Sequence, residues 1–289
     1  MITSYSTSYS NGAAARRRGQ CALSCWLVRA LALAAPLASG CVQYSGATDD
    51  PDPGHGADPA MTGQIATADT LAENVRLADT VVDAPGATGT GFGDPTRAVN
   101  GVRGAGSRSG SLDVFSLGYT PGVNDHITLA WSHGRLQNGP GPDLAVFENP
   151  FLINGGGVFM DLIIVEVSLD GVEFRALAHD YTATDPTVYH NNPALWSGFA
   201  GKTPVLLNVD TNPVAPFNAT AAGGDQFDLD TVEGADAVAQ SIRTNGARFV
   251  RLTSAPARIN PDTGAAYVHD ALSNGADIDG IYGRYLVSE

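Results

Sequence analysis

Cysteine is scarce in this chain of 289 residues, and none of its three cysteines lies after position 41. The residues that follow Cys41 therefore hold no disulfide. Cys21 and Cys25 lie in an apolar stretch, and no cluster of cysteine or histidine follows that would complete a zinc site. The pair is interpreted as apolar filler of a signal peptide.

Positive charge is also scarce, with 16 Lys and Arg against 30 Asp and Glu. Four of the basic residues, Arg16, Arg17, Arg18 and Arg29, lie in the first forty positions, which contain no acid. Beyond them, 12 basic groups face 30 acidic ones, a formal charge of −18. A field of this sign repels phosphate backbones, so we expect no nucleic-acid partner.

Common catalytic and metal-binding motifs are missing. The six histidines form no His-x-His or His-x-x-x-His pair, which gives no support for a zinc hydrolase. Arg108 stands at the centre of Gly106–Gly110, where a nucleophile elbow has serine. Asp143, Glu148, Asp161 and Glu166 offer carboxylates for glycoside hydrolysis, which needs two acids about 5 to 10 Å apart, a separation that sequence does not measure.

Long hydrophobic runs are absent as well. The uninterrupted apolar run Ala30–Ala38 is nine residues long, against about 20 residues needed to span a bilayer. A basic flank before it and small residues after it predict a cleaved signal peptide at residues 1–40.

The segment Leu37–Cys41 resembles the bacterial lipobox, although Ala38 stands where leucine is common. The resemblance implies that Cys41 carries a lipid anchor, and Val42 in place of Asp implies the outer membrane. Residues 41–63 are rich in Ser, Gly, Asp, Pro and Ala, a composition typical of a disordered tether.

Residues 64–289 are expected to form one all-β domain, an antiparallel β-sandwich. Short apolar runs recur there between clusters of Gly, Pro, Asn and Asp, without a sustained helical stripe. The predicted strands are Leu112–Leu117, His126–Trp131, Asp143–Glu148, Leu162–Ser168, Phe174–Ala178, Phe249–Thr253 and Asp279–Leu286. One short helix is predicted at 231–243.

Two features of this domain give sharper predictions. Asp170–Gly171 lies between two β-branched runs and favours a type I′ hairpin. The long segment 181–230 has little periodicity, which is typical of a functional or elaborately packed loop. Its aromatic residues Tyr189, Trp196 and Phe199 are candidates for stacking on a sugar, whereas Trp131 lies on a predicted core strand.

Several segments resemble a family of bacterial cell-surface lipoproteins: Ala98–Gly104, Gly110–Gly118, Asn138–Phe151, Glu166–Phe174 and Ala222–Leu229. More loosely, Ser168–Phe174 and Ala247–Leu252 resemble discoidin-like, galactose-binding domains. The second resemblance implies a jelly roll that binds glycans or proteins through loops at one end. The resemblance does not indicate a particular ligand.

Two acidic clusters suggest calcium, which takes oxygen ligands. In a strand, Asp228 and Asp230 would share one face, as would Asp277 and Asp279, and Asp225 lies close by. Asp277–Asp279 also resembles an acidic motif on the final strand of carbohydrate-binding jelly rolls, where it implies structural calcium. The alternative is that these are solvated turn aspartates.

Three functions stay open from the sequence. The first is a surface-anchored, non-catalytic binding module for a glycan or protein. The second is a glycoside hydrolase or other secreted hydrolase, and the third is a structural envelope protein.

Overall fold

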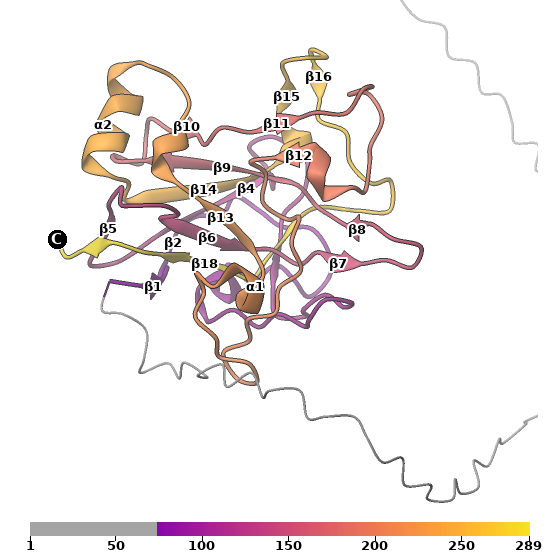
Figure 1. The fold of residues 1–289 in the computed structure, drawn as a ribbon, viewed down its shortest axis with the longest axis horizontal. Helices are drawn as coiled ribbons and strands as arrows, with labels where there is room; N and C mark the ends of the chain where they lie inside the picture. The colour runs from indigo at the N-terminus through magenta and orange to yellow at the C-terminus, as the bar shows by residue number, and fades with distance from the viewer. Residues whose placement is uncertain (1–73) are drawn as a thin grey trace, which may run out of the picture. The chain divides into compact units, whose positions relative to one another are not determined.

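Two antiparallel β-sheets lie one above the other and form a sandwich (Figure 1). The structure is a computed structural model that describes residues 74–289. The predicted signal peptide, Cys41 and the predicted tether at 41–63 lie outside the described residues. Strands prevail over helices between 74 and 289, and the two sheets do not close into a barrel, so the predicted all-β sandwich is confirmed.

The four-stranded sheet consists, in spatial order, of β1 (Arg76–Leu77), β18 (Gly280–Gly283), β6 (Leu144–Phe147) and β13 (Asp225–Phe227). The five-stranded sheet consists of β10 (Arg175–Ala176), β9 (Ile163–Ser168), β14 (Phe249–Ser254), β4 (His126–Ala130) and β2 (Thr80–Asp83).

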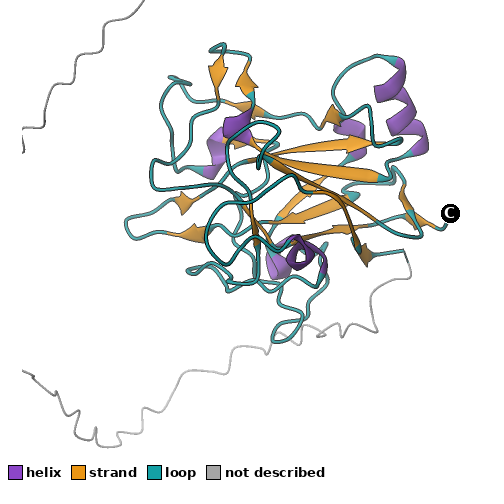
Figure 2. Cartoon of the chain, turned by 180° about the vertical axis from the view of Figure 1, so that it is seen from behind, coloured by secondary structure: helices purple, strands orange, loops and turns teal. Residues whose placement is uncertain are grey.

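Short two-stranded ladders link the loops. Three join neighbouring parts of the chain: β7 (Phe151–Leu152) with β8 (Val158–Phe159), β11 (Asp180–Tyr181) with β12 (Trp196–Ser197), and β15 (Ile259–Asn260) with β16 (Ala265–Ala266). Two join distant parts: β3 (Phe115–Ser116) with β17 (Asp277–Ile278), and β5 (Arg135–Leu136) with β19 (Leu286–Val287). The α-helices are α1 (Ala219–Ala222) and α2 (Ala237–Asn245). The 3-10 helices are η2 (Pro95–Val99), η3 (Pro193–Leu195), η4 (Leu229–Thr231) and η5 (Ala255–Ala257). Figure 2 shows the same elements from behind, with long loops between the strands.

The main core lies between the two sheets because successive side chains of a strand point to opposite faces. In β9, Ile163, Val165 and Val167 belong to this core, together with Leu144 and Val146 of β6. Trp131 is also part of it, as predicted.

The long segment 181–230 packs on part of each outer face of the sandwich. Val205 and Leu207 pack on Phe147 of the four-stranded sheet. Trp196 and Phe199 pack in a second cluster with Ile164 of the five-stranded sheet. The long segment is therefore a packed part of the fold that extends the core beyond the two sheets.

Several strands are shorter than predicted, for local reasons. Leu112 is 78% exposed, and only Phe115 and Ser116 of the predicted strand 112–117 form a ladder. Tyr285 has a φ of 61°, which separates β18 from β19 and splits the predicted strand 279–286.

The single predicted helix begins later than expected. Asp236 caps α2, since its carboxylate accepts hydrogen bonds from the backbone N–H groups of Val238 and Ala239. Gly246, with a φ of 83°, follows the last residue of α2. The helix therefore occupies 237–245, whereas the prediction was 231–243.

The predicted hairpin at Asp170–Gly171 exists, but its turn is wider than a type I′ turn. Val167 of β9 pairs with Arg175 of β10, and residues 169–174 connect the two strands. A type I′ turn needs positive φ at both central residues, and only Gly171 has it, at 78°. The Asp170 carboxylate instead accepts hydrogen bonds from Val172 N (2.8 Å) and Glu173 N (2.9 Å). The type I′ prediction was wrong because it took no account of this side-chain cap.

Candidate functional site

Polar side chains lie side by side on the outer face of the five-stranded sheet. The strand register places Arg251 of β14 between Thr128 of β4 and Glu166 of β9. Two residues further along β14, Thr253 lies between His126 and Ile164. Apolar and polar residues alternate along much of these strands. The apolar side chains are buried on the inner face of the sheet, and charged and hydroxyl groups lie next to one another on the outer face.

Glu166 is the centre of this row. Arg251 donates to both carboxylate oxygens, from Nη2 at 2.7 Å and from Nε at 2.9 Å, and Thr253 Oγ1 donates at 2.7 Å. Arg251 also lies over the ring of Phe174, 4.0 Å from its centroid. Burial alone would raise the pKa of Glu166, but the hydrogen bonds from Arg251 and Thr253 hold it below the usual value.

Arg258 extends the network across the sheet. Its Nη2 donates to Glu166 at 3.3 Å and its Nη1 to the buried Asp125 at 3.0 Å. Asp125 in turn contacts His126 Nδ1 at 2.8 Å, and His126 Nε2 lies 3.1 Å from Asp83. Each ionisable side chain in this series of contacts has a hydrogen-bonding partner within it. The two carboxylates that accept from Arg258 fix the orientation of its guanidinium.

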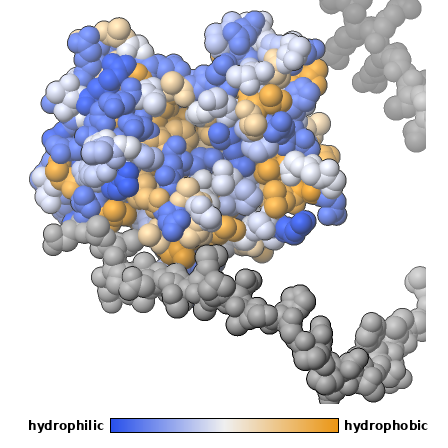
Figure 3. Space-filling view, viewed as in Figure 1, coloured by the Kyte–Doolittle hydropathy of each residue, from blue (hydrophilic) through white to orange (hydrophobic). Residues whose placement is uncertain are grey.

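A groove of about 330 Å³ opens above Glu166 and Arg258. We call it the sheet groove, and its lining residues are Ile164, Glu166, Ala176, His179, Glu233, Arg258, Ile259, Pro261 and Tyr267. Figure 3 shows a hollow between the surface over α2 and the surface over β15 and β16, where this groove lies. Its volume is at the lower end of the range of small-ligand pockets, roughly 300–1,000 Å³.

The walls of the sheet groove present hydrogen-bonding groups in fixed orientations. His179 Nδ1 lies 2.9 Å from the carbonyl oxygen of Leu177 and 3.2 Å from Glu233. The hydroxyl of Tyr267 makes no hydrogen bond with a described residue, and burial raises its pKa to about 12. His179 and Tyr267 both pack edge-on against Phe199, at 5.0 and 5.3 Å between ring centroids.

The aromatic residues predicted to stack on a sugar lie in the core, which corrects that expectation. Trp196 and Phe199 are fully buried, and the Trp196 ring is stacked on Tyr181 at 3.6 Å. Tyr189 is half-buried, and its hydroxyl donates to the carbonyl oxygen of Met160. Phe199 supports the rings of His179 and Tyr267, and Trp196 and Phe199 offer no surface to a ligand, because the long segment folds back onto the sheet.

The five aspartates predicted to share a calcium ion have separate partners. Asp225 accepts from Lys202 N and Thr203, Asp228 caps η4, and Asp230 accepts from Asn138. Asp277 accepts from Ser116 and Asn149. Asp279 accepts from the backbone N–H of Arg103. Among residues 74–289, no three His, Cys, Asp or Glu side chains already form a group that could hold a metal ion.

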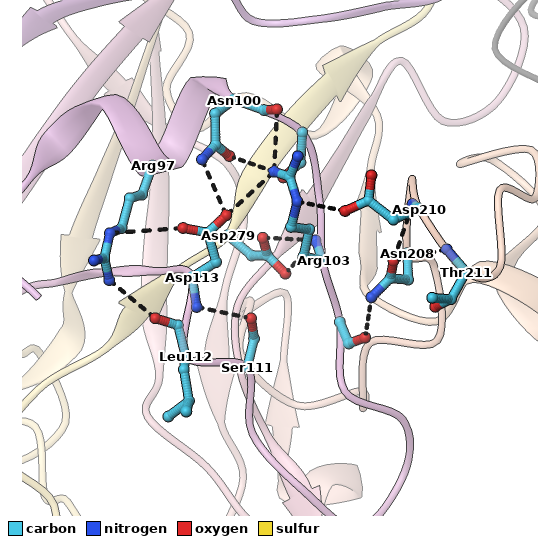
Figure 4. A network of polar contacts seen from close by, with 12 residues as sticks. Arg97, Asn100, Arg103, Ser111, Leu112, Asp113, Asn208, Asp210, Thr211 and Asp279 are labelled. Atoms are coloured by element: carbon cyan, nitrogen blue, oxygen red, sulfur yellow. Dashed lines mark hydrogen bonds and ion pairs between the residues drawn. The ribbon is translucent and has the colours of Figure 1, made fainter.

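Asp279 belongs to a polar network that ties three segments together (Figure 4). Arg103 N lies 2.9 and 3.0 Å from the two oxygens of Asp279, and the Arg103 guanidinium contacts Asp113 at 3.2 Å and Asp210 at 2.8 Å. The network joins the last long strand to two distant loops. The backbone N–H, Nε and Nη1 of Arg103 all donate within the protein, which favours a structural role for the network.

The four acids considered for glycoside hydrolysis are also in different environments. Asp143 is fully buried and accepts from Gly139 N and Leu229 N. Glu166 is paired with two arginines in the sheet groove. Glu148 and Asp161 lie near each other in a different part of the fold, where the charge of Asp161 adds to burial in raising the pKa of Glu148.

No protein-family model, curated protein or solved structure matches this chain. The resemblances noted from its segments therefore stay predictions. Within 74–289 the structure has no helix long and apolar enough to cross a bilayer.

Sequence reasoning missed the sheet groove. Its polar residues Glu166, His179, Glu233 and Arg258 come from four separate segments, and only Glu166 had been singled out, for another role. The one available signal was the polar alternation of Glu166 in an otherwise apolar strand. That alternation indicates an outward side chain and says nothing about what covers it.

Proposed function

We propose that this chain is a lipid-anchored envelope protein whose β-sandwich binds a neutral glycan in the sheet groove without catalysing a reaction. The observation that carries the proposal is the groove itself, with Glu166 and Arg258 held rigidly at its floor. The membrane anchor rests on the sequence alone, through the pattern before Cys41.

The chemistry of the lining favours sugar hydroxyls, which both donate and accept hydrogen bonds. The groove offers the guanidinium of Arg258 as donor, the carboxylate of Glu233 as acceptor, and the Tyr267 hydroxyl and His179 ring as groups that do either. Ile164 and Ile259 supply apolar contact for the faces of a sugar ring. Planar side chains pre-oriented by their neighbours reduce the entropic cost of binding.

The charge of the chain narrows the ligand class. Two carboxylates line the groove, and the sequence after position 40 has a formal charge of −18, so an anionic polysaccharide would be repelled. A neutral glycan is not repelled, and a short glycan fits an open groove of this volume better than a protein does, because protein interfaces bury about 800 Å² on each partner.

The state of Glu166 supports binding over hydrolysis. A glycosidase needs one carboxyl that stays protonated at the working pH, which requires a raised pKa. Arg251 and Thr253 lower the pKa of Glu166 against the effect of burial, which keeps it ionised. It serves as a fixed acceptor and orienting group, and it is a poor general acid.

A glycan array with the purified protein tests the proposal. Ile259 is 64% exposed on the rim, so Ile259→Glu places a charge over the groove with little effect on the fold. Val172, 81% exposed and outside the lining of the groove, gives the matched control Val172→Glu. We expect glycan binding that Ile259→Glu weakens at least about tenfold, with the control unchanged.

Three results would contradict the proposal. Binding that both variants retain would place the ligand elsewhere on the protein. Release of reducing sugar from a bound glycan would indicate a hydrolase. Absence of any glycan hit, together with a protein partner captured through the same groove residues, would favour a protein ligand.

A further inference from the structure

Three carboxylates meet where the ends of β6, β9 and β17 come together. Glu148 follows the last residue of β6, Asp161 lies two positions before β9, and Asp277 begins β17. Asp161 and Asp277 both act on Glu148 as neighbouring negative charges. We call these three residues the acidic cluster, which shares no residue with the sheet groove.

Glu148 lies at the bottom of the acidic cluster. Its side chain is 2% exposed, and its Oε1 accepts a hydrogen bond of 2.8 Å from the backbone N–H of Asp277. Its Oε2 is buried and has no hydrogen-bond partner. An unpaired carboxylate oxygen in the interior is costly, and native proteins contain few of them.

The partners of the other two acids are all neutral. The Asp161 carboxylate accepts from Ser273, whose Oγ lies 2.5 Å from the hydroxyl of Tyr119. The Asp277 carboxylate accepts from Ser116 and, at 3.4 Å, from Asn149.

Among the described residues, no Lys, Arg or His forms an ion pair with any of the three acids. Burial raises the pKa of each of them, that of Asp161 to about 7, and the neighbouring charges add to the effect for Glu148 and Asp161. Within residues 74–289, the protein thus gathers three carboxyl groups without a cationic partner.

Oxygen atoms converge beside Gly201, where there is no side chain to separate them. A Cβ on Gly201 would lie 2.3 Å from the carbonyl oxygen of Asp161 and 3.3 Å from Glu148 Oε2. Gly201 has a φ of 83°, a conformation that other residues rarely adopt. The Asp161 carbonyl oxygen and the unpaired Glu148 Oε2 therefore both lie close to the backbone of Gly201.

We propose that the acidic cluster binds one calcium ion, with Glu148 Oε2 as a ligand and Asp161 and Asp277 as its further carboxylates. Hard oxygen donors suit Ca²⁺ and Mg²⁺, and a mixed set of carboxylates and carbonyls on loop ends suits the flexible geometry of Ca²⁺ better. In the described residues, no three acids are grouped around one point. Calcium binding therefore requires the carboxylates of Asp161 and Asp277 to rotate away from their serine partners and toward the ion.

The proposal is tested on the purified protein by terbium luminescence and thermal unfolding. Tyr119 lies next to Ser273, close enough to sensitise Tb³⁺ bound at Asp161, and Ca²⁺ should compete for the site. In the thermal assay, calcium at about a hundredfold excess over Kd should raise Tm by roughly 5 to 10 °C, and equimolar magnesium should have a much smaller effect.

Glu148→Gln separates calcium binding from simple charge repulsion. Without calcium, this variant should melt above the wild type because one of the repelling charges is gone. Its calcium affinity should fall at least about tenfold because a charged ligand is lost. Asp161→Asn is the second variant if Glu148→Gln fails to fold. Asp230→Asn is the matched control, since Asp230 accepts from Asn138 outside the acidic cluster, and it should respond to calcium as the wild type does.

Identical melting of the wild type in calcium, magnesium and chelator, without sensitised terbium emission, would overturn the proposal. The acids would then be protonated in the folded protein. A calcium response that Glu148→Gln and Asp161→Asn both retain would also overturn it, because the ion would bind elsewhere.

Discussion

Replacing Trp196 by alanine tests directly whether the aromatic cluster beneath the sheet groove is core or ligand surface. Trp196 is the largest fully buried side chain of the described residues. Its ring stacks on Tyr181 at 3.6 Å and meets Phe199 edge-on at 5.4 Å. Its indole N–H donates to the carbonyl oxygen of His190 at 2.9 Å.

The size of the effect follows from these contacts. Truncation of a buried Phe or Trp to Ala costs about 3–5 kcal/mol, from lost transfer free energy and the cavity left behind. His190 is exposed, so water replaces the lost hydrogen bond and adds little to the cost. We therefore expect Trp196→Ala to lower the free energy of unfolding by about 4 kcal/mol, and Tm by roughly 8 to 16 °C for a domain of this size.

Urea unfolding followed by circular dichroism measures this change. Val172→Ala, on an 81% exposed side chain, should stay within about 0.5 kcal/mol of the wild type. Trp196→Phe should fall between the two variants, because stacking on Tyr181 is kept. A loss below about 1 kcal/mol for Trp196→Ala would refute the burial argument and return Trp196 to the candidate ligand surface.

Two further predictions concern the polar network and the membrane anchor. Burial raises the pKa of Asp279 from 3.8 to about 7, so the folded protein holds this proton more tightly and stability falls as pH rises from about 4 to 7. Asp279→Asn should remove that decline and gain at most about 4 kcal/mol relative to the wild type at pH 8, measured by urea unfolding at pH 5 and 8. An unchanged pH profile would contradict this. Cys41→Ser should abolish metabolic labelling with an alkyne fatty acid in the bacterial host, and equal labelling of both proteins would contradict the anchor.

The proposed glycan site in the sheet groove and the proposed calcium site in the acidic cluster depend on different residues. The groove needs Glu166 ionised and its partners in place, and the acidic cluster needs a cation or protons to offset its charge. Loss of glycan binding in Ile259→Glu leaves the calcium test untouched. Loss of the calcium response in Glu148→Gln leaves the groove intact, since Glu148 does not line it.

Local patterns in the sequence determined the fold class and most of the central strands. Alternation in β9 and β14 placed one face of each strand in the core, and these strands occupy nearly the predicted residues. The same local information predicts export and a lipid anchor through the segment before Cys41. These features depend on neighbours within a few residues, which a single sequence displays.

Only the tertiary structure decided which side chains are covered and which meet. Trp196 and Phe199 read as loop aromatics, yet the loop folds onto the sheet and buries them. The sequence offered Glu148 only as one of four carboxylates for hydrolysis, yet chain folding buries it and brings Asp277, more than a hundred residues away, beside it. Burial and the pairing of charges depend on long-range packing, in which residues far apart in the sequence share one low-dielectric environment. The local periodicity of the sequence contains no information about this packing.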